Sequence, residues 1–150
     1  MSEQYPIHLF IDLEETIIDD WQRKNFINID SIKNTIDYLN PDHLHIYSAA
    51  IWDLNDVNEF NNKLRDNLEI LLKRKIENVI SMEYAQKCSN WVSYDMSIQE
   101  LLLAIGKFRL FIDFCKHTVR NCFCILLDDM CDNEIIENLD LNLKIQMIRI

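Results

Sequence analysis

Acidic side chains follow two apolar runs of the sequence, at points where strands of a buried sheet are expected to end. Asp12 and Glu14 come after the first run, and Asp128 and Asp129 come after a second run near the C-terminus. Two acidic strand ends in one small domain repel each other unless a cation lies between them. Hard divalent cations such as Mg²⁺ bind oxygen ligands, so we expect a magnesium site where these ends meet. If the sheet order separates the two ends, the same acids only cap helices.

The composition limits the chain to one globular domain and excludes several functions. With 150 residues, 49% of them apolar, the chain can fill one core, with Trp21, Trp52 and Trp91 expected in it or at its rim. The single glycine, Gly106, excludes a P-loop and a dinucleotide-binding turn, in which several glycines let the backbone approach phosphate. A formal net charge of -10 leaves no broad basic surface, so we expect no extended nucleic-acid binding.

The cysteines and histidines show no spacing typical of a zinc site. The five cysteines are Cys88, Cys115, Cys122, Cys124 and Cys131. The four histidines are His8, His43, His45 and His117. We therefore expect structural thiols and no zinc ligands among the histidines. We see no signal peptide and no membrane-spanning run, and we expect a cytoplasmic protein without membrane contact.

Short apolar runs alternate with stretches of helical periodicity along the whole chain. The expected strands are 7–11, 44–47, 78–82, 122–127 and 143–150, the last at a sheet edge. The expected helices are one capped by Asp30 or Ser31 and ending at 39, then 55–74, 97–118 and 133–139. Gly106 makes 97–118 either one kinked helix or two helices, and residues 17–29 are expected to form a small hairpin or flap. This alternation predicts one α/β domain over residues 1–150, a three-layer sandwich with a mainly parallel sheet.

Three stretches of the sequence resemble, in order, the four motifs of haloacid-dehalogenase-like (HAD) phosphohydrolases. LFIDLEETIID is similar to the first motif, a hydrophobic strand followed by Asp-x-Asp-x-Thr. HLHIYSAA resembles the second motif, a strand that ends in Ser or Thr. GKFRLFIDFCKHTVRNCFCILLDD resembles the stretch from the third-motif lysine to the fourth-motif acids. The resemblance covers nearly the whole chain and implies a small HAD-like domain with a Rossmannoid sheet, a minimal flap and no large cap.

The resemblance implies a role in phosphoryl transfer for five side chains. Asp12 falls on the nucleophile, which attacks phosphorus and forms an aspartyl-phosphate. Glu14 falls on the acid/base position, which protonates the leaving oxygen and then activates water. Thr16, Ser48 and Lys107 fall on the positions that contact the phosphoryl group, and Lys107 also offsets the negative charge around Asp12.

The resemblance also implies a bound Mg²⁺, with Asp12, the Glu14 backbone carbonyl and Asp128 or Asp129 as its ligands. Two features depart from the family pattern. The second acid is Glu14 rather than an aspartate, and misplacing a reacting group by about 1 Å costs on the order of 10²-fold in rate. Glu15 replaces the glycine that is common at its position. The metal ligands survive these changes better than the acid/base position does.

The resemblance leaves two functions open. A capless site is open and suits a phosphorylated substrate such as a macromolecular end, with Lys107 or Lys116 as the motif lysine. The glycine-poor, Asn- and Ile-rich sequence also resembles small HAD-like proteins encoded by large tailed bacteriophages. That likeness implies an alternative, a phage protein with weak or lost catalysis that binds and inhibits a host defence protein in the host cytoplasm. The sequence leaves the oligomeric state open.

Overall fold

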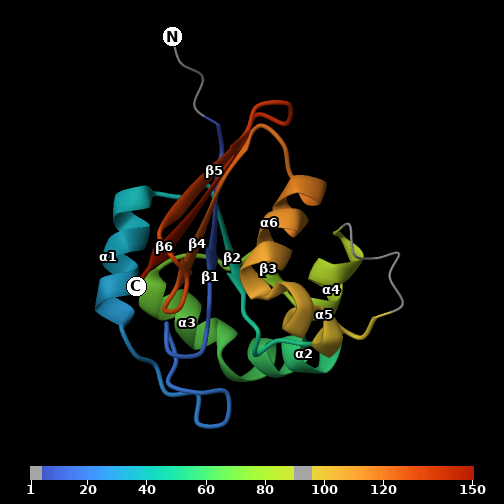
Figure 1. Cartoon of the computed structure of the whole chain (residues 1–150). Coiled ribbons are helices and arrows are strands. Elements are labelled where there is room, and N and C mark those ends of the chain that lie inside the picture. The colour runs from blue at the N-terminus through green and yellow to red at the C-terminus, as the bar shows by residue number, and fades with distance from the viewer. Residues whose placement is uncertain (1–4, 90–95) are drawn as a thin grey trace.

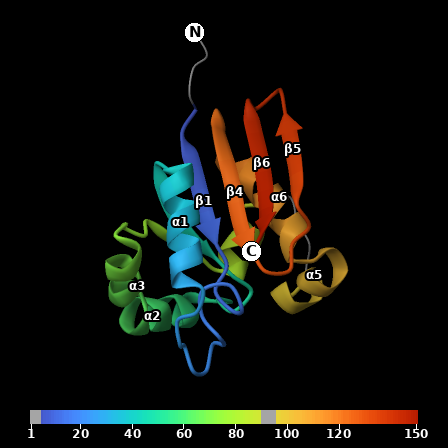
Figure 2. The ribbon, with the colours of Figure 1, turned by 90° about the vertical axis from the view of Figure 1, so that its left-hand side faces the viewer.

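Six strands form one mixed sheet in the computed structural model, which describes residues 5–89 and 96–150 (Figure 1). The strands are β1 (Ile7–Ile11), β2 (His43–Tyr47), β3 (Asn78–Ile80), β4 (Cys122–Asp128), β5 (Glu134–Asn138) and β6 (Leu143–Arg149). They lie in the order β3-β2-β1-β4-β6-β5, and every neighbouring pair is parallel except β5 and β6. The arrow of β5 therefore points opposite to that of β6 (Figure 2). The predicted α/β class with a mainly parallel sheet is confirmed.

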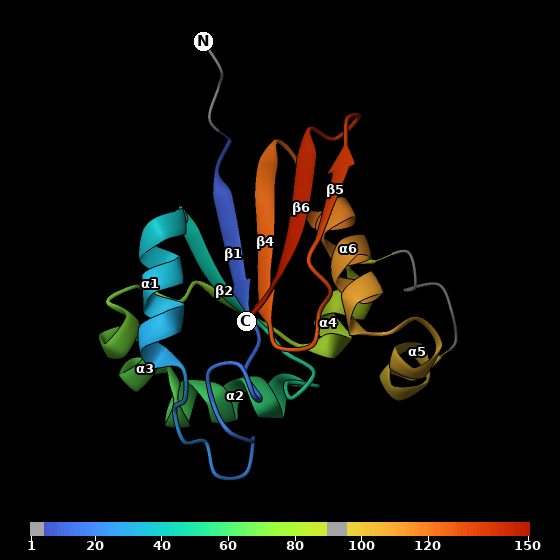
Figure 3. The ribbon, with the colours of Figure 1, turned by 60° about the vertical axis from the view of Figure 1, so that its left-hand side comes forward.

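Two layers of helices enclose this sheet (Figure 3). The helices are α1 (Ile29–Leu39), α2 (Leu54–Lys63), α3 (Arg65–Leu72), α4 (Met82–Lys87), α5 (Ile98–Ile105) and α6 (Lys107–Thr118). The first three pack on one face of the sheet and the last three on the other, so Leu9 of β1 faces the first layer and Phe10 the second. Burial on both faces explains why the strands are continuous apolar runs. Trp21 and Trp52 are half-buried against the two cores, and Trp91 lies outside the described residues.

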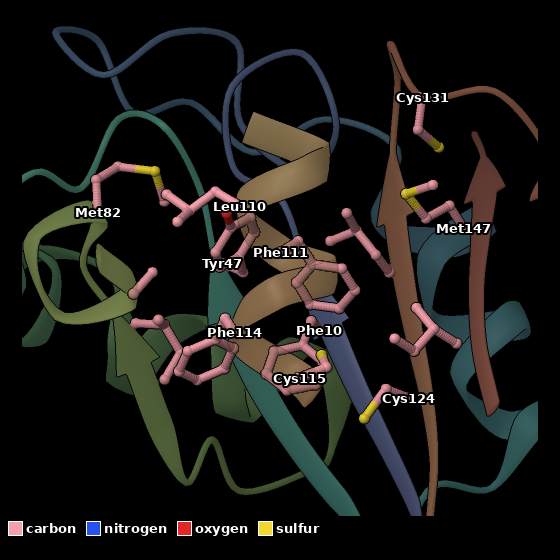
Figure 4. Packing of buried hydrophobic residues seen from close by; sticks show 14 of the residues in the cluster. Phe10, Tyr47, Met82, Leu110, Phe111, Phe114, Cys115, Cys124, Cys131 and Met147 are labelled. Atoms are coloured by element: carbon pink, nitrogen blue, oxygen red, sulfur yellow. The ribbon is translucent and has the colours of Figure 1, made fainter. Parts of the chain in front are cut away.

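The core between the sheet and α6 is built around aromatic rings (Figure 4). Phe10 of β1 and Tyr47 of β2 both contact Phe111 of α6, with ring centroids 5.0 Å apart in each pair. Cys115 and Cys124 fill adjoining space as free, buried thiols. This packing holds α6 against β1 and β2 near their carboxyl ends.

Gly106 separates α5 from α6, so the two-helix alternative for residues 97–118 is the observed one. Its φ of 82° and ψ of 162° form a combination that residues with a side chain rarely adopt. Ser97 caps the start of α5, because its Oγ accepts from the Glu100 N–H and donates to the Glu100 carboxylate. The glycine turn then lets α6 begin at Lys107.

Three predicted elements are wrong. Most of the predicted helix over 133–139 forms strand β5 instead, because the backbone of residues 134–138 pairs antiparallel with β6. With β5 at the edge, β6 is an interior strand rather than the expected edge strand. The helix expected over 55–74 divides into α2 and α3, because the buried Leu64 leaves helical geometry with a φ of -123°.

The start of α1 also differs from the prediction. The helix begins at Ile29, before the expected cap at Asp30 or Ser31, and Asn28 precedes it in the left-handed conformation with a φ of 54°. The Asn28 side chain makes no capping hydrogen bond to this helix end. Among the described residues, no helix has the length and apolar character needed to cross a membrane.

The segment between β1 and α1 forms a flap beyond the carboxyl end of β1 (Figure 1). One antiparallel bridge joins Ile18 and Phe26, so the expected hairpin is reduced to this bridge within a loop. Lys24 anchors the flap, because its Nζ lies 2.8 Å from the Glu59 carboxylate of α2 and 4.3 Å from the centre of the Trp21 ring. The flap is therefore tied to the helical layer beside it.

Candidate active site

The predicted acidic strand ends meet at the carboxyl edge of the sheet. Asp12 directly follows β1 and Asp128 ends β4, and these two strands are neighbours. The Asp12 N–H donates to a backbone carbonyl of β4 at 3.0 Å, so the pairing continues past the end of β1. An open cavity of about 350 Å³ lies at this edge, and its wall includes Glu14, Ser48 and Lys107. The alternative in which the sheet separates the acids is excluded.

Lys107 lies between the two buried aspartates. Its Nζ is 2.7 Å from Asp12 Oδ1 and 2.5 Å from Asp128 Oδ2. The aspartates are 5% and 1% exposed, so little water screens these ion pairs. The Tyr47 hydroxyl donates to the Lys107 carbonyl at 2.8 Å and fixes the start of α6. Lys116, the alternative motif lysine, lies in the last turn of α6, about 14 Å further along the helix axis.

The pKa of Asp12 is raised above its ordinary value. Burial is the main cause because it disfavours the ionised form, and the nearby charge of Asp128 acts in the same direction. The ammonium of Lys107 and a hydrogen bond from Ser48 oppose this increase in part. Added positive charge among these carboxylates would relieve their repulsion, so the site favours a cation.

Thr16 connects the two acidic loops and is completely buried. Its hydroxyl oxygen accepts from the Asp129 N–H at 3.1 Å and lies 3.0 Å from Asp12 Oδ2 and 3.2 Å from Asp129 Oδ1. A hydroxyl has one proton, so it donates to one of these carboxylates at a time. This burial does not fit the contact with substrate expected for Thr16. The residue instead positions the two aspartates that flank it.

Three carboxylates at this edge can hold a metal ion. Within residues 5–89 and 96–150, Asp12, Asp128 and Asp129 are the one group of at least three acidic, cysteine or histidine side chains whose ligand atoms all lie within 4.8 Å. The Met130 N–H donates to Asp128 Oδ1 at 2.7 Å, and Arg149 Nε–H donates to the Asp129 carbonyl at 3.1 Å. A donor set made of oxygen atoms suits a hard divalent cation.

Glu14, the expected acid/base residue, borders the cavity but is also bonded to the flap. Its Oε2 accepts from the Trp21 N–H at 3.0 Å. The next residue, Glu15, has a φ of 60°, in the left-handed region that favours glycine. Because a Cβ is crowded in this conformation, the glutamate carries a backbone cost of about 1–2 kcal/mol.

Two residues that shape the site were missed by the sequence analysis. Tyr47 directly precedes Ser48, but its place in an apolar run indicated only core packing. Arg149 lies opposite Asp128 in the register between β4 and β6. Arg149 could have been predicted only if β6 were known to pair with β4. The prediction placed β6 at a sheet edge without naming its neighbour.

Comparisons of the chain with protein-family models, with curated proteins and with solved structures give no match. Function is therefore inferred from the carboxyl edge of the sheet. There, three carboxylates and one half-buried lysine converge beside an open cavity.

Proposed function

We propose that this chain is a HAD-like, magnesium-dependent phosphohydrolase with an open, capless site. The observation that carries the proposal is the contact of Lys107 Nζ with both Asp12 and Asp128, two buried carboxylates from neighbouring strands. The strand order supports it, because the resemblance to HAD-like proteins requires these strand ends to meet. Ionisable groups that converge in a cleft with perturbed pKa values are typical of catalytic sites.

The donor set at this edge fits Mg²⁺. The proposed ligands are carboxylate oxygens of Asp12, Asp128 and Asp129, together with the backbone carbonyl of Glu14. When bound, the ion would neutralise negative charge so that a carboxylate and a phosphate can approach each other. The site therefore suits a phosphate ester as substrate.

Four side chains divide the work of hydrolysis in this proposal. A carboxylate oxygen of Asp12 bonds to phosphorus while the bond to the leaving oxygen breaks, which gives an aspartyl-phosphate. Glu14 gives its proton to the leaving oxygen and then takes one from a water that attacks phosphorus, which releases phosphate and restores Asp12. Lys107 and Ser48 hold the phosphoryl oxygens. For this, the Glu14 carboxylate must exchange its bond with the Trp21 N–H for one with substrate.

The test is hydrolysis of p-nitrophenyl phosphate with and without Mg²⁺. Asp12→Asn is nearly isosteric and removes the nucleophilic charge, so turnover should fall to the level of the buffer. The matched control is Asp42→Asn, because Asp42 is exposed at the amino end of the sheet and accepts from the Ile7 N–H at 2.8 Å. The control should keep full activity. Equal turnover in wild type and Asp12→Asn, or no Mg²⁺-dependent turnover of any phosphate ester, would overturn the proposal.

The hydrogen bond between Glu14 and the Trp21 N–H favours a second candidate function. A carboxylate that stabilises the flap is less available as an acid, which fits a protein with weak or lost catalysis. In this alternative the chain acts by binding a host protein, and the fold serves as a scaffold. Paired variants of Glu14, described below, distinguish the two functions.

A further inference from the structure

Three of the four histidines gather on the face of the sheet that carries α4 and α6. His8 of β1 lies beside His43 of β2 in the parallel register, and His45 follows on the same face. The ring centroid of His8 is 4.4 Å from that of His43 and 5.3 Å from that of His45, and the rings are stacked. Since a strand rises by about 3.3 Å per residue, His8 lies about 13 Å along the strand from Asp12. The histidine cluster is therefore separate from the carboxylate site.

Two ring nitrogens of this cluster form a hydrogen bond. His8 Nδ1 and His45 Nε2 are 3.0 Å apart, so one of them carries the proton that the other accepts, and a metal ion would replace that proton. Two nitrogens that bind the same tetrahedral metal ion at roughly 2.0–2.1 Å lie about 3.3 Å apart. A small movement of either ring thus gives the spacing of two ligands on one ion. The sequence prediction that the histidines supply no metal ligands considered only their spacing along the chain.

Polar groups behind the rings suit metal-binding histidines. Asn78 Nδ2 lies 3.4 Å from His45 Nδ1. A half-turn of that amide presents its oxygen to an Nδ1–H, the tautomer in which Nε2 is free to bind a metal. Glu77 lies 2.8 Å from His43 Nδ1 and holds that ring in its stack against His8. The rings are therefore oriented by groups outside the pair of ligand nitrogens.

His45 is buried and His8 is half-buried, and one side of the two rings remains accessible. An open cavity of about 430 Å³ adjoins both rings and is also bordered by Asn78 and Tyr84. Water or a small ligand in this cavity can complete the coordination of an ion.

We propose that His8 Nδ1 and His45 Nε2 form a second metal site, for a divalent transition metal of the Zn²⁺ or Ni²⁺ class. Imidazole nitrogen suits these ions, whereas Mg²⁺ prefers the oxygen ligands at the strand ends. His43 is a positioning residue, since it stacks on His8 and its Nδ1 is bonded to Glu77. The site does not depend on the phosphohydrolase proposal.

The experiment is calorimetric titration with NiCl₂ in excess MgCl₂, so that Mg²⁺ competes for the carboxylate site. Wild type should bind one Ni²⁺ per chain. The variants His8→Gln and His45→Gln should each bind Ni²⁺ at least about 10-fold more weakly. The matched control is His117→Gln, because His117 is exposed on α6, and it should bind like wild type. Unchanged affinity in the His8 and His45 variants, or no binding by wild type, would overturn the proposal.

A second measurement uses wild-type protein alone, in case a variant fails to fold. Ni²⁺ is paramagnetic and broadens the NMR signals of nearby amides. Substoichiometric Ni²⁺ should broaden the amide signals of His8, His45 and Asn78 first. Preferential broadening at Asp128 and Asp129 would place the ion at the carboxylates and would contradict a histidine site.

Discussion

The cavities at the two ends of the sheet differ in size and in the buried charge beside them. The cavity at the amino end is the larger, at about 780 Å³, and is bordered by side chains such as Leu39 and Leu139. The cavity at the carboxyl end is about 350 Å³ and brings together Asp12, Lys107 and Asp128. Cavity volume alone would therefore place the functional site at the amino end. Buried charge is the better guide, because ionised groups remain out of water only where other groups compensate them.

The parallel strands explain why the charge gathers at one end. β1, β2 and β4 run in the same direction, so the loops that follow them leave from the same edge of the sheet. Asp12, Ser48 and Asp128 each lie at such a strand end. The amino end receives chain from the preceding helices and has no comparable set of buried charges among the described residues.

The largest effect is expected from Lys107→Met. The variant leaves two buried carboxylates without their ammonium partner, so the free energy of unfolding should fall by about 3–5 kcal/mol. Phosphatase activity should also be lost. The matched control is Lys144→Met at the amino end, where Lys144 Nζ lies 4.9 Å from the centre of the Phe123 ring. That variant should lose about 0.5–1 kcal/mol.

Urea unfolding of both lysine variants measures this contrast, with Lys116→Met as a third sample. Lys116 should behave like Lys144, since it lies at the far end of α6. Equal losses of unfolding free energy in the variants of Lys107 and Lys144 would contradict this account, because charge at the carboxyl end would then stabilise the fold no more than charge at the amino end.

The next effect is on rate and concerns Glu14. If hydrolysis is the function, Glu14→Gln should lower the rate by roughly 10²–10⁴-fold, the usual contribution of a general acid/base. Glu14→Asp should keep or increase turnover, because it restores the usual acid of the family. Glu137→Gln at the amino end is the control and should be neutral.

Measuring cellular activity in a bacterial host beside the phosphatase rate separates the two candidate functions. Loss of cellular activity in well-folded Glu14→Gln would argue against a function by binding alone. Full cellular activity in a variant without turnover would favour the binding protein and would reject hydrolysis as the function.

A smaller effect is expected from the backbone positions that shape the site. Gly106→Ala should destabilise the chain by about 1–3 kcal/mol, because the observed φ and ψ strain any side chain. Apart from the chain adjoining Gly106, no atom of the described residues lies within 4 Å of the added Cβ, so the cost arises from the backbone. Glu15→Gly should stabilise the chain by up to about 1 kcal/mol, because it relieves a left-handed glutamate. Thermal unfolding measures both, and a change of the same sign in both variants would contradict this account.

The smallest effect is the pH dependence of Asp12→Asn stability without metal. Because the pKa of Asp12 is raised in the folded state, the folded protein binds the proton more readily than the unfolded chain. That stabilisation is complete below the unfolded pKa and is lost as pH rises through the folded pKa. Asp12→Asn should therefore be more stable than wild type at neutral pH, and the difference should vanish in acid.

Melting temperatures from acid to neutral pH in EDTA check this sign, with Asp42→Asn as the control at the amino end. The control should show no comparable gain at neutral pH. A gain for Asp12→Asn that persists unchanged in acid would show that ionisation of Asp12 is not its cause.

The sequence was sufficient for the parts of the fold that depend on continuous apolar runs. β1, β2 and β4 were predicted within about one residue at each end, and their polar ends gave Asp12, Ser48 and Asp128. The helix predicted over residues 133–139 was wrong because pairing with β6 overrides the local helical preference. That pairing cannot be recognised from the neighbouring residues in the sequence.

The features of the site that the sequence did not predict are mainly contacts across the sheet. Tyr47 and Arg149 act through partners far along the chain, and their local sequence indicates only a core residue and a strand end. The contact between His8 and His45 was not predicted for the same reason, since the two residues meet only when β1 and β2 are aligned. Motif order located residues that follow strands, whereas positioning residues required the register of the sheet.

The most direct test of the central claim needs no knowledge of the substrate. Beryllium fluoride with Mg²⁺ mimics a phosphoryl group on a carboxylate, and ¹⁹F NMR detects its bound form. Wild type and Asp42→Asn should give bound ¹⁹F signals that require Mg²⁺, and Asp12→Asn should give none. Absence of a bound signal in wild type, or its persistence in Asp12→Asn, would contradict a phosphoryl-accepting Asp12 at the carboxyl end of the sheet.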